Sequence, residues 1–231
     1  MNASEDDASK DDALRGSPAG DSASRPSMSP DRLRAVYDDL APRFERFDRV
    51  NRLLTDRYRR RVLAGAEGRV LDVACGTGEN FPYLPADVDV VGVDISPGML
   101  ASAAERAAEL GIDADLREMD AASLSFPDAS FDTVVSSLST CTFPDPEAAL
   151  REMSRVCAPG GRILLFEHGR STVGPVARFQ DWRADAHFAA AGCRWNQEPL
   201  DVVAAAGLDV RESWDGFLGI FTGIEAAPSD A

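Results

Sequence analysis

Residues 70–79 read VLDVACGTGE, and this stretch decides the fold. An apolar segment runs directly into a turn that contains Gly76 and Gly78, and the polar Glu79 opens the next element. Glycine has no Cβ, so a backbone with two glycines one residue apart can pass very close to a bound ligand. A tight turn that binds nothing would use the same pair. Taken alone, the stretch predicts a buried strand followed by a candidate ligand-binding turn.

Strand and helix signals alternate after this turn. The buried-strand candidates are residues 69–74, 88–94, 115–119, 131–138 and 162–167. The helix candidates between them are residues 97–110 and 146–158. Such alternation predicts an α/β fold with a mostly parallel sheet and helices on both faces. Ligands of such sheets bind beyond the carboxyl ends of the strands, which is where the glycine turn lies.

The C-terminal part contains two more helical segments and two strand-like segments. The helical segments are residues 172–191 and 200–206, and the apolar segments are residues 208–214 and 217–224. Only Asp215 and Gly216 separate the two apolar segments. An Asp-Gly pair between strand-like runs predicts an antiparallel hairpin closed by a tight turn.

The first thirty positions differ in composition from the rest of the chain. Residues 1–29 are rich in Ser, Ala, Asp, Gly and Pro, so they can bury little apolar surface and are predicted to form a disordered acidic tail. Residues 30–226 are predicted to form one domain, followed by a short tail at 227–231. From Pro30 the apolar residues recur at helical spacing in two successive stretches. We expect two helices there, folded as a lid over the ligand end of the sheet, with their arginines on a solvated face.

The charge balance excludes several kinds of partner. Asp and Glu number 39 against 24 Lys and Arg, a formal net charge of −15. Such a surface repels phosphates, so nucleic acid is not an expected partner. No apolar run is long enough for an integral membrane segment, and no apolar secretory core is present, so a cytoplasmic protein is predicted. The acid excess with Lys10 as the only lysine favours a halophilic source, although a GC-rich genome would also replace lysine by arginine.

The four cysteines are well separated in the sequence. They are Cys75, Cys141, Cys157 and Cys193, without a Cys-x-x-Cys pair or a histidine close in sequence. This spacing indicates neither a metal site nor a disulfide framework. Four reduced and mostly buried thiols are therefore expected.

Two acidic residues follow the next strands along the chain. Asp94 ends the segment VVGVD about twenty positions after the glycine turn, where a carboxylate can accept both hydroxyls of a ribose. Each such charge-assisted bond contributes roughly 1.5 to 3 kcal/mol. Alternatively, Asp94 caps the helix that begins near Ser96. Asp120 in the segment EMDA can accept from the exocyclic amine of an adenine, or it is an ordinary loop acid.

Four segments together resemble the class I S-adenosylmethionine-dependent methyltransferases. They are VLDVACGTGEN, VVGVDISPGML, EMDAASLSFPDASFDTVV and APGGRILLFEHG, which span residues 69–169. The resemblance implies a Rossmann-like, seven-stranded, mostly parallel sheet with a C-terminal antiparallel hairpin, and S-adenosylmethionine as cofactor. It places Asp72, Ala74, Gly76 and Gly78 at the methionine end of the cofactor. Asp94 would lie at the ribose, with Ile95 also at the cofactor, and Asp120 and Ala121 would flank the adenine. The segment from Ser136 to Ser139 would lie near the sulfonium.

Other segments resemble small-molecule branches of these enzymes. The segment EHGRS at 167–171 and the segment GCRWN at 192–196 are similar to thiol methyltransferase-like proteins, and YDDLAPRF at 37–44 is similar in part to ubiquinone/menaquinone C-methyltransferases. The core is also similar to bacterial phosphatidylethanolamine N-methyltransferases. These resemblances imply a small-molecule acceptor: a thiol, a quinol precursor or a lipid headgroup. The segment SSLS stands at 136–139 instead of an Asn/Asp-Pro-Pro-Tyr motif, which disfavours methylation of adenine or glutamine amines.

Two rival classes were weighed against a methyltransferase. A dinucleotide-dependent oxidoreductase would carry a third glycine where Phe81 stands. An S-adenosylmethionine-binding assembly or regulatory factor without turnover stays open, and the sequence gives no oligomeric state.

A general base is needed only for an acceptor that enters protonated. His168 and His187 are the only histidines, and imidazole titrates near neutral pH. His168 is the candidate catalytic residue, and a structural role at the strand end is the alternative. Tyr37, Phe44 and Trp195 are either walls of an apolar pocket or ordinary core residues.

Overall fold

The structure is a computed structural model, and it describes residues 27–228 apart from the side chains of residues 44–50. The predicted tail therefore lies outside the described residues up to residue 26. Met28 is described and buried, beside Gly192. No helix within the described part of the chain combines the length and apolarity needed to cross a membrane.

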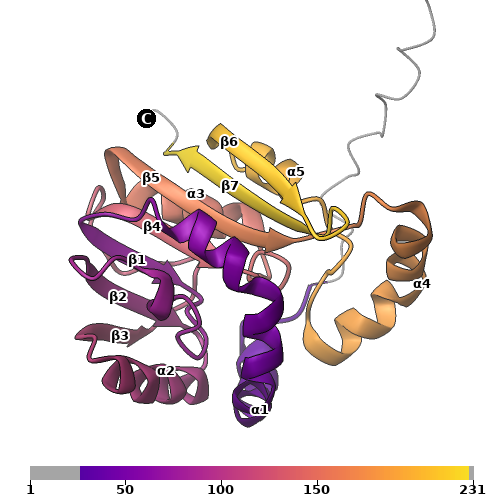
Figure 1. Cartoon of the computed structure of the whole chain (residues 1–231), viewed down its shortest axis with the longest axis horizontal. Helices are drawn as coiled ribbons and strands as arrows, with labels where there is room; N and C mark the ends of the chain where they lie inside the picture. Colours follow the sequence, from indigo (N-terminus) through magenta and orange to yellow (C-terminus); the bar gives the residue numbers. More distant parts are fainter. Residues whose placement is uncertain (1–26, 229–231) are drawn as a thin grey trace, which may run out of the picture.

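A single seven-stranded sheet forms the centre of the molecule (Figure 1). Its order is β3-β2-β1-β4-β5-β7-β6, in which the first five are parallel and β7 runs antiparallel between β5 and β6. The strands are β1 (Arg69–Val73), β2 (Asp89–Asp94), β3 (Ala114–Glu118), β4 (Phe131–Ser137), β5 (Cys157–His168), β6 (Asp209–Gly216) and β7 (Phe221–Ala227). The predicted Rossmann-like fold with an antiparallel C-terminal hairpin is confirmed.

Helices follow the strands as the alternation predicts. They are α1 (Pro30–Leu63), α2 (Pro97–Leu110), α3 (Pro146–Val156), α4 (Gly174–Ala191) and α5 (Pro199–Ala205), with the short 3-10 helix η2 (Phe81–Tyr83). Ser96 caps α2 through its Oγ, which accepts from Met99 N at 3.1 Å, and the Asp145 carboxylate caps α3 in the same way. Each cap is followed by a proline, whose missing N–H costs nothing in the first turn.

The two faces of the sheet bury different helices. On β1, Val70 packs in a cluster with Tyr58 and Leu63 of α1, while Leu71 packs in a cluster with Leu150 of α3. This follows from the period of two in a strand, which sends successive side chains to opposite faces. The helices α1 and α2 therefore cover one face, and α3 and α5 cover the other. Helix α4 stands apart, beyond the carboxyl end of β5 (Figure 1).

The N-terminal lid is one helix and not the two that the sequence analysis predicted. Helix α1 continues over 34 residues through Pro42. Proline removes one helical hydrogen bond and crowds the preceding turn. Both ends of α1 are nevertheless packed on the same domain, with Leu33 and Ala41 buried near its start and Leu63 at its end. No glycine occurs between Pro30 and Leu63 to end the helix.

The arginines of α1 do not all lie on a solvated face. Arg59 is only 3% exposed, and its guanidinium hydrogen-bonds Asn80 Oδ1. Asn80 in turn donates to Asp72 Oδ1 at 2.9 Å. The prediction of a wholly solvated arginine face is therefore wrong at Arg59, which joins α1 to the strand and the turn.

Replacing Arg59 is expected to destabilise the fold. In Arg59→Met the aliphatic volume is kept, but Asn80 and Asp72 lose the buried cation beside them. We expect the free energy of unfolding to fall by about 1 to 3 kcal/mol, measured by urea unfolding without ligand. The control is Arg60→Met, because Arg60 pairs with Asp56 at the surface with a side chain 64% exposed, and exposed pairs contribute less than about 1 kcal/mol. Equal losses in the two variants would contradict the role given to Arg59.

The hairpin turn begins directly after the predicted Asp-Gly pair and does not include it. Asp215 and Gly216 are the last two residues of β6, and the turn is formed by residues 217–220, with positive φ at Phe217, Leu218 and Gly219. A Cβ on Gly216 would lie 2.4 Å from the ring of Tyr58. Gly216 is therefore a glycine because a ring of α1 packs on the strand, and not because the chain turns there.

Candidate active site

A cavity of about 390 Å³ opens at the carboxyl ends of β1, β2 and β4, beneath α1. Cavities of about 300 to 1,000 Å³ are typical of small-molecule sites. Helix α1, the ends of β2 and β4, the start of α2 and the loops after β1 to β4 line it. The lining residues are Leu33, Tyr37, Asn51 and Arg59 of α1, Ala74, Cys75, Gly76, Thr77, Glu79 and Asn80 after β1, Val93, Asp94 and Ile95 at the end of β2, Met99 of α2, Met119, Asp120 and Ala121 after β3, and Ser137, Leu138, Ser139, Thr142, Phe143 and Pro144 from the end of β4 and its loop. The site lies where the sheet topology predicts a ligand.

The two glycines of the first turn have different reasons to be glycine. Gly76 lines the cavity with φ at +55°, and no described atom lies within 4 Å of where its Cβ would be. Gly78 has φ at +77° but is not among the lining residues, and its Cβ would lie 2.7 Å from the ring of Phe81. Gly76 thus leaves room for a ligand, whereas Gly78 leaves room for a core side chain.

Asp94 holds the turn after β1 against the end of β2. Its Oδ2 accepts from Gly76 N and its Oδ1 accepts from Ser96 N, both at 2.9 Å. Burial raises the pKa of Asp94, and the backbone donors oppose that rise. Because Ser96 caps α2 with its own hydroxyl, the carboxylate of Asp94 is left to the turn and the cavity.

The predicted adenine segment also reaches the cavity. Asp120 and Ala121 line it together with Met119. Asp120 Oδ1 accepts from Ala122 N at 2.9 Å, which fixes the loop after β3. Ile95 lines the same cavity from the end of β2.

The loop after β4 forms the opposite wall. Ser137, Leu138 and Ser139 line the cavity, while Ser136 lies behind them, fully buried, and donates from Oγ to Val73 O at 2.9 Å. Leu138 has φ at +55°, as does Ala74 across the cavity. A left-handed backbone at a residue other than glycine costs about 1 to 3 kcal/mol, and such strain clusters at functional sites.

Two fully buried carboxyl groups lie beneath the residues that line the cavity. Asp72 Oδ2 has no hydrogen-bond partner among the described residues, and burial raises the pKa of Asp72 to about 7. Glu167 accepts from Ser139 N at 3.2 Å and from Thr140 N at 3.4 Å, and burial raises its pKa to about 7 as well. Neither group is among the lining residues, so both act on the cavity through the backbone and side chains above them.

Asp72 gives stability a pH dependence that Asp72→Asn is expected to weaken. An unfolded aspartate has a pKa of about 3.9, against about 7 in the fold. Between these values the unfolded state releases its proton while the folded state keeps it, so wild-type stability falls as pH rises from about 4 to about 7. Urea unfolding should show that the free energy of unfolding of the variant, relative to that of the wild type, increases as pH rises across this window. Above about pH 7, where Asp72 is ionised in both states, the difference should stay constant. The exposed Asp89→Asn serves as control, and parallel profiles for Asp72→Asn and the wild type would contradict the assignment.

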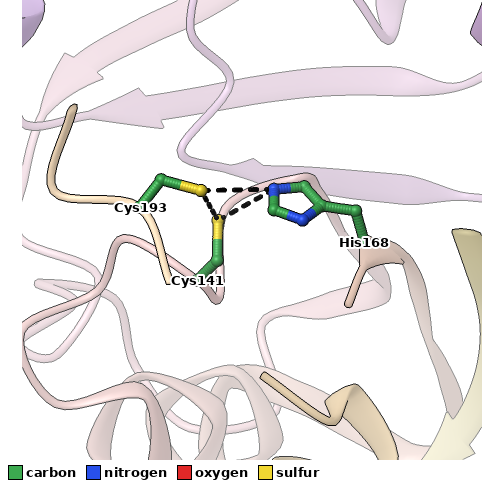
Figure 2. A group of neighbouring side chains, drawn as sticks. All are labelled: Cys141, His168 and Cys193. Carbon is green, nitrogen blue, oxygen red and sulfur yellow. Dashed lines mark hydrogen bonds between the residues drawn. The ribbon is translucent and has the colours of Figure 1, made fainter. Parts of the chain in front are cut away.

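The candidate catalytic histidine faces two thiols. His168 Nε2 lies 3.3 Å from Cys141 Sγ and 3.4 Å from Cys193 Sγ, and the two sulfurs are 3.3 Å apart. Figure 2 shows the three side chains pointing toward one another. The hydrogen bond shared with Cys141 and the neighbouring imidazole lower the pKa of Cys193. His168 is not among the residues that line the cavity. The four cysteines are free and buried, as expected, but Cys141 and Cys193 lie together beside His168 although their sequence spacing indicated no such cluster.

The three aromatic residues considered as pocket walls lie in different places. Tyr37 lines the cavity, and burial raises its pKa. Trp195 instead stacks on His187 with the ring centroids 4.4 Å apart, and neither residue is among those lining the cavity. The side chain of Phe44 lies outside the described residues.

Residues 71–165 match the protein family described as a methyltransferase domain. This match includes the turn at Gly76, the end of β2 and the loop after β4, which all line the cavity. The chain is 44% identical over 112 residues to a phosphatidylethanolamine N-methyltransferase of Cereibacter sphaeroides, covering 48% of this chain and 55% of the relative. It is 39% identical over 152 residues to a demethylmenaquinone methyltransferase of Renibacterium salmoninarum, covering 63% of this chain and 62% of the relative. The chain therefore spans less than two thirds of the length of these relatives.

The solved structures agree on the fold of this chain. The [4+2]-cyclase SpnF superposes with a TM-score of 0.72 at 20% identity, over 89% of this chain and 98% of that one. A likeness at this identity shows the fold alone. Because that neighbour is named a cyclase, the fold by itself does not settle which reaction a chain performs.

The cavity residues fit S-adenosylmethionine, the methyl donor that the sequence resemblance implies. The open space at Gly76 accommodates a ligand next to the backbone, and the carboxylate of Asp94 stands at the same wall. Asp120 adds a polar acceptor on the neighbouring loop, between the apolar side chains of Met99 and Met119.

Proposed function

We propose that this chain transfers a methyl group from S-adenosylmethionine to a small-molecule acceptor, which is a thiol, a quinol precursor or a lipid headgroup. One observation carries the proposal: a single cavity reaches from Gly76 and Asp94 to the strained loop at Leu138 and Ser139. Such a cavity has room for a cofactor at one wall and an acceptor at the other. The relatives named for demethylmenaquinone and for phosphatidylethanolamine support a small acceptor.

In this proposal the carboxyl ends of β1 to β3 hold the cofactor. Asp94 accepts hydrogen bonds from the ribose hydroxyls, and Gly76 lets the backbone of the turn lie close to the cofactor. Asp120 and Ala121 flank the adenine, and Ile95 contacts the cofactor beside Asp94. Ala74 borders the methionine end directly. Asp72 and Gly78 support the same wall from behind it, and Ser136 supports the opposite wall from behind.

When bound, the cofactor supplies an activated methyl group on a sulfonium. The chain then has to align an acceptor behind that methyl group and exclude water. Helix α1 contributes Leu33 and Tyr37 to the lining of the cavity. Holding two reactants in line can supply about 7 to 11 kcal/mol of the barrier.

The catalytic role of His168 stays a prediction. Its Nε2 faces Cys141 and Cys193, one layer behind the loop whose Ser139 and Thr142 line the cavity. A direct proton transfer to His168 would require the acceptor to reach past this loop.

The acidic surface supports a cytoplasm rich in salt as the working environment of the chain. The net charge of −15 and the single lysine are the observations behind this part of the proposal.

An acceptor panel tests the proposed function. The full chain is incubated with S-adenosylmethionine and with thiols, quinol precursors or aminolipids, and release of S-adenosylhomocysteine is measured. We expect release that depends on one of these acceptor classes. Tight cofactor binding without release for any class would contradict the proposal and favour a binding factor without turnover.

A further inference from the structure

Three side chains of metal-binding chemistry converge beside the cavity from distant parts of the chain. Cys141 lies in the loop after β4, His168 is the last residue of β5, and Cys193 follows α4. Their ligand atoms all lie within 4.8 Å of one another, and both thiols are buried (Figure 2).

The spacing of the three atoms is close to that of a tetrahedral zinc site. Zinc binds cysteine sulfur at about 2.3 Å and histidine nitrogen at about 2.0 to 2.1 Å. At tetrahedral angles these bonds place two sulfurs roughly 3.8 Å apart, and a sulfur and a nitrogen roughly 3.6 Å apart. The observed separations are 3.3 Å, 3.3 Å and 3.4 Å. Outward movements of a few tenths of an ångström would therefore admit the ion.

The surroundings hold the three groups in place. Arg194 N and Arg194 Nη1 both donate to Cys141 O, at 2.9 Å and 3.3 Å, which ties the loop of Cys141 to the loop of Cys193. His168 also hydrogen-bonds the backbone of Trp195. A second hydrogen bond of this kind orients the imidazole in most histidine metal sites.

We propose that Cys141, His168 and Cys193 bind one Zn²⁺ ion. Two thiolates and one imidazole form a donor set that suits zinc. Sites with three protein ligands leave a fourth position for water or a substrate atom. Ser139 and Thr142, on either side of Cys141, line the cavity, so this position lies next to the wall where an acceptor is expected. The metal site does not depend on the proposed function.

A direct metal titration tests the site. The full chain is purified under reducing conditions, stripped with a chelator and titrated with Zn²⁺, or with Co²⁺ as a spectroscopic probe. We expect one equivalent of metal per chain, and for Co²⁺ the absorption of thiolate-to-metal charge transfer with tetrahedral d–d bands. Cys141→Ser, Cys193→Ser and His168→Asn should each weaken binding by more than about tenfold, since even partners of ligands contribute 10- to 100-fold.

The control is Cys157→Ser, which removes a buried cysteine outside the cluster and should leave metal binding unchanged. Circular dichroism and cofactor titration check that each variant is folded, and the wild-type titration needs no variant at all. Failure of the reduced wild type to bind either metal would overturn the proposal. So would full binding by Cys193→Ser, or a Cys141–Cys193 disulfide in protein that binds no metal after reduction.

Discussion

Asp94→Ala is expected to weaken S-adenosylmethionine binding at least about tenfold. The carboxylate accepts from Gly76 N and Ser96 N and still has lone pairs for ribose hydroxyls at the cavity wall. A hydrogen bond to a charged group contributes about 1.5 to 3 kcal/mol, which is a factor of roughly 10 to 100 in affinity. Calorimetric titration of the folded variant measures the loss.

The control for Asp94→Ala lies on the same strand. Asp89 begins β2, is exposed, and stands at the end of the strand away from the cavity. Asp89→Ala should therefore keep the wild-type affinity. Unchanged affinity in Asp94→Ala would remove the ribose role from Asp94 and leave it only the support of the turn.

Gly76→Val is expected to abolish measurable cofactor binding while the domain still folds. The φ of +55° is unfavourable for a β-branched residue, by roughly 1 to 2 kcal/mol, and the added side chain would occupy the open space at the cavity wall. We expect a loss of affinity of a hundredfold or more, equivalent to roughly 2.7 kcal/mol. Calorimetry measures the loss of cofactor affinity, and urea unfolding measures the loss of stability from the strained backbone.

Gly111→Val is a closely matched control for this substitution. Gly111 has φ at +69°, no described atom lies within 4 Å of its Cβ position, and it ends α2 away from the cavity. Its stability loss should resemble that of Gly76→Val, with no change in affinity. If both variants bind S-adenosylmethionine with the same affinity, the proposal that Gly76 leaves room for the cofactor is contradicted.

The sheet and the cofactor side of the site could be predicted because their signals are local. The turn at Gly76 directly follows a buried strand, Asp94 ends the next strand, and Asp120 lies just after the one that follows. Parallel strands bring their carboxyl ends to one edge of the sheet, so these residues must meet. A repeated strand–loop–helix order thus converts sequence spacing into spatial proximity.

The remaining features depend on contacts between distant segments. Cys141 and Cys193 are 52 positions apart, and no sequence spacing places them beside His168. Arg59 is buried only because Asn80 and the carboxylate of Asp72 lie opposite α1. In the same way the hairpin turn was misplaced because the packing of α1, and not local turn chemistry, requires a glycine in β6.

The most direct test of the central claim is a calorimetric titration of the full chain with S-adenosylmethionine, with NAD as the comparison ligand. The cavity around Gly76 and Asp94 predicts a single S-adenosylmethionine site per chain and no measurable binding of NAD. Absence of S-adenosylmethionine binding, or equal binding of NAD, would contradict the account.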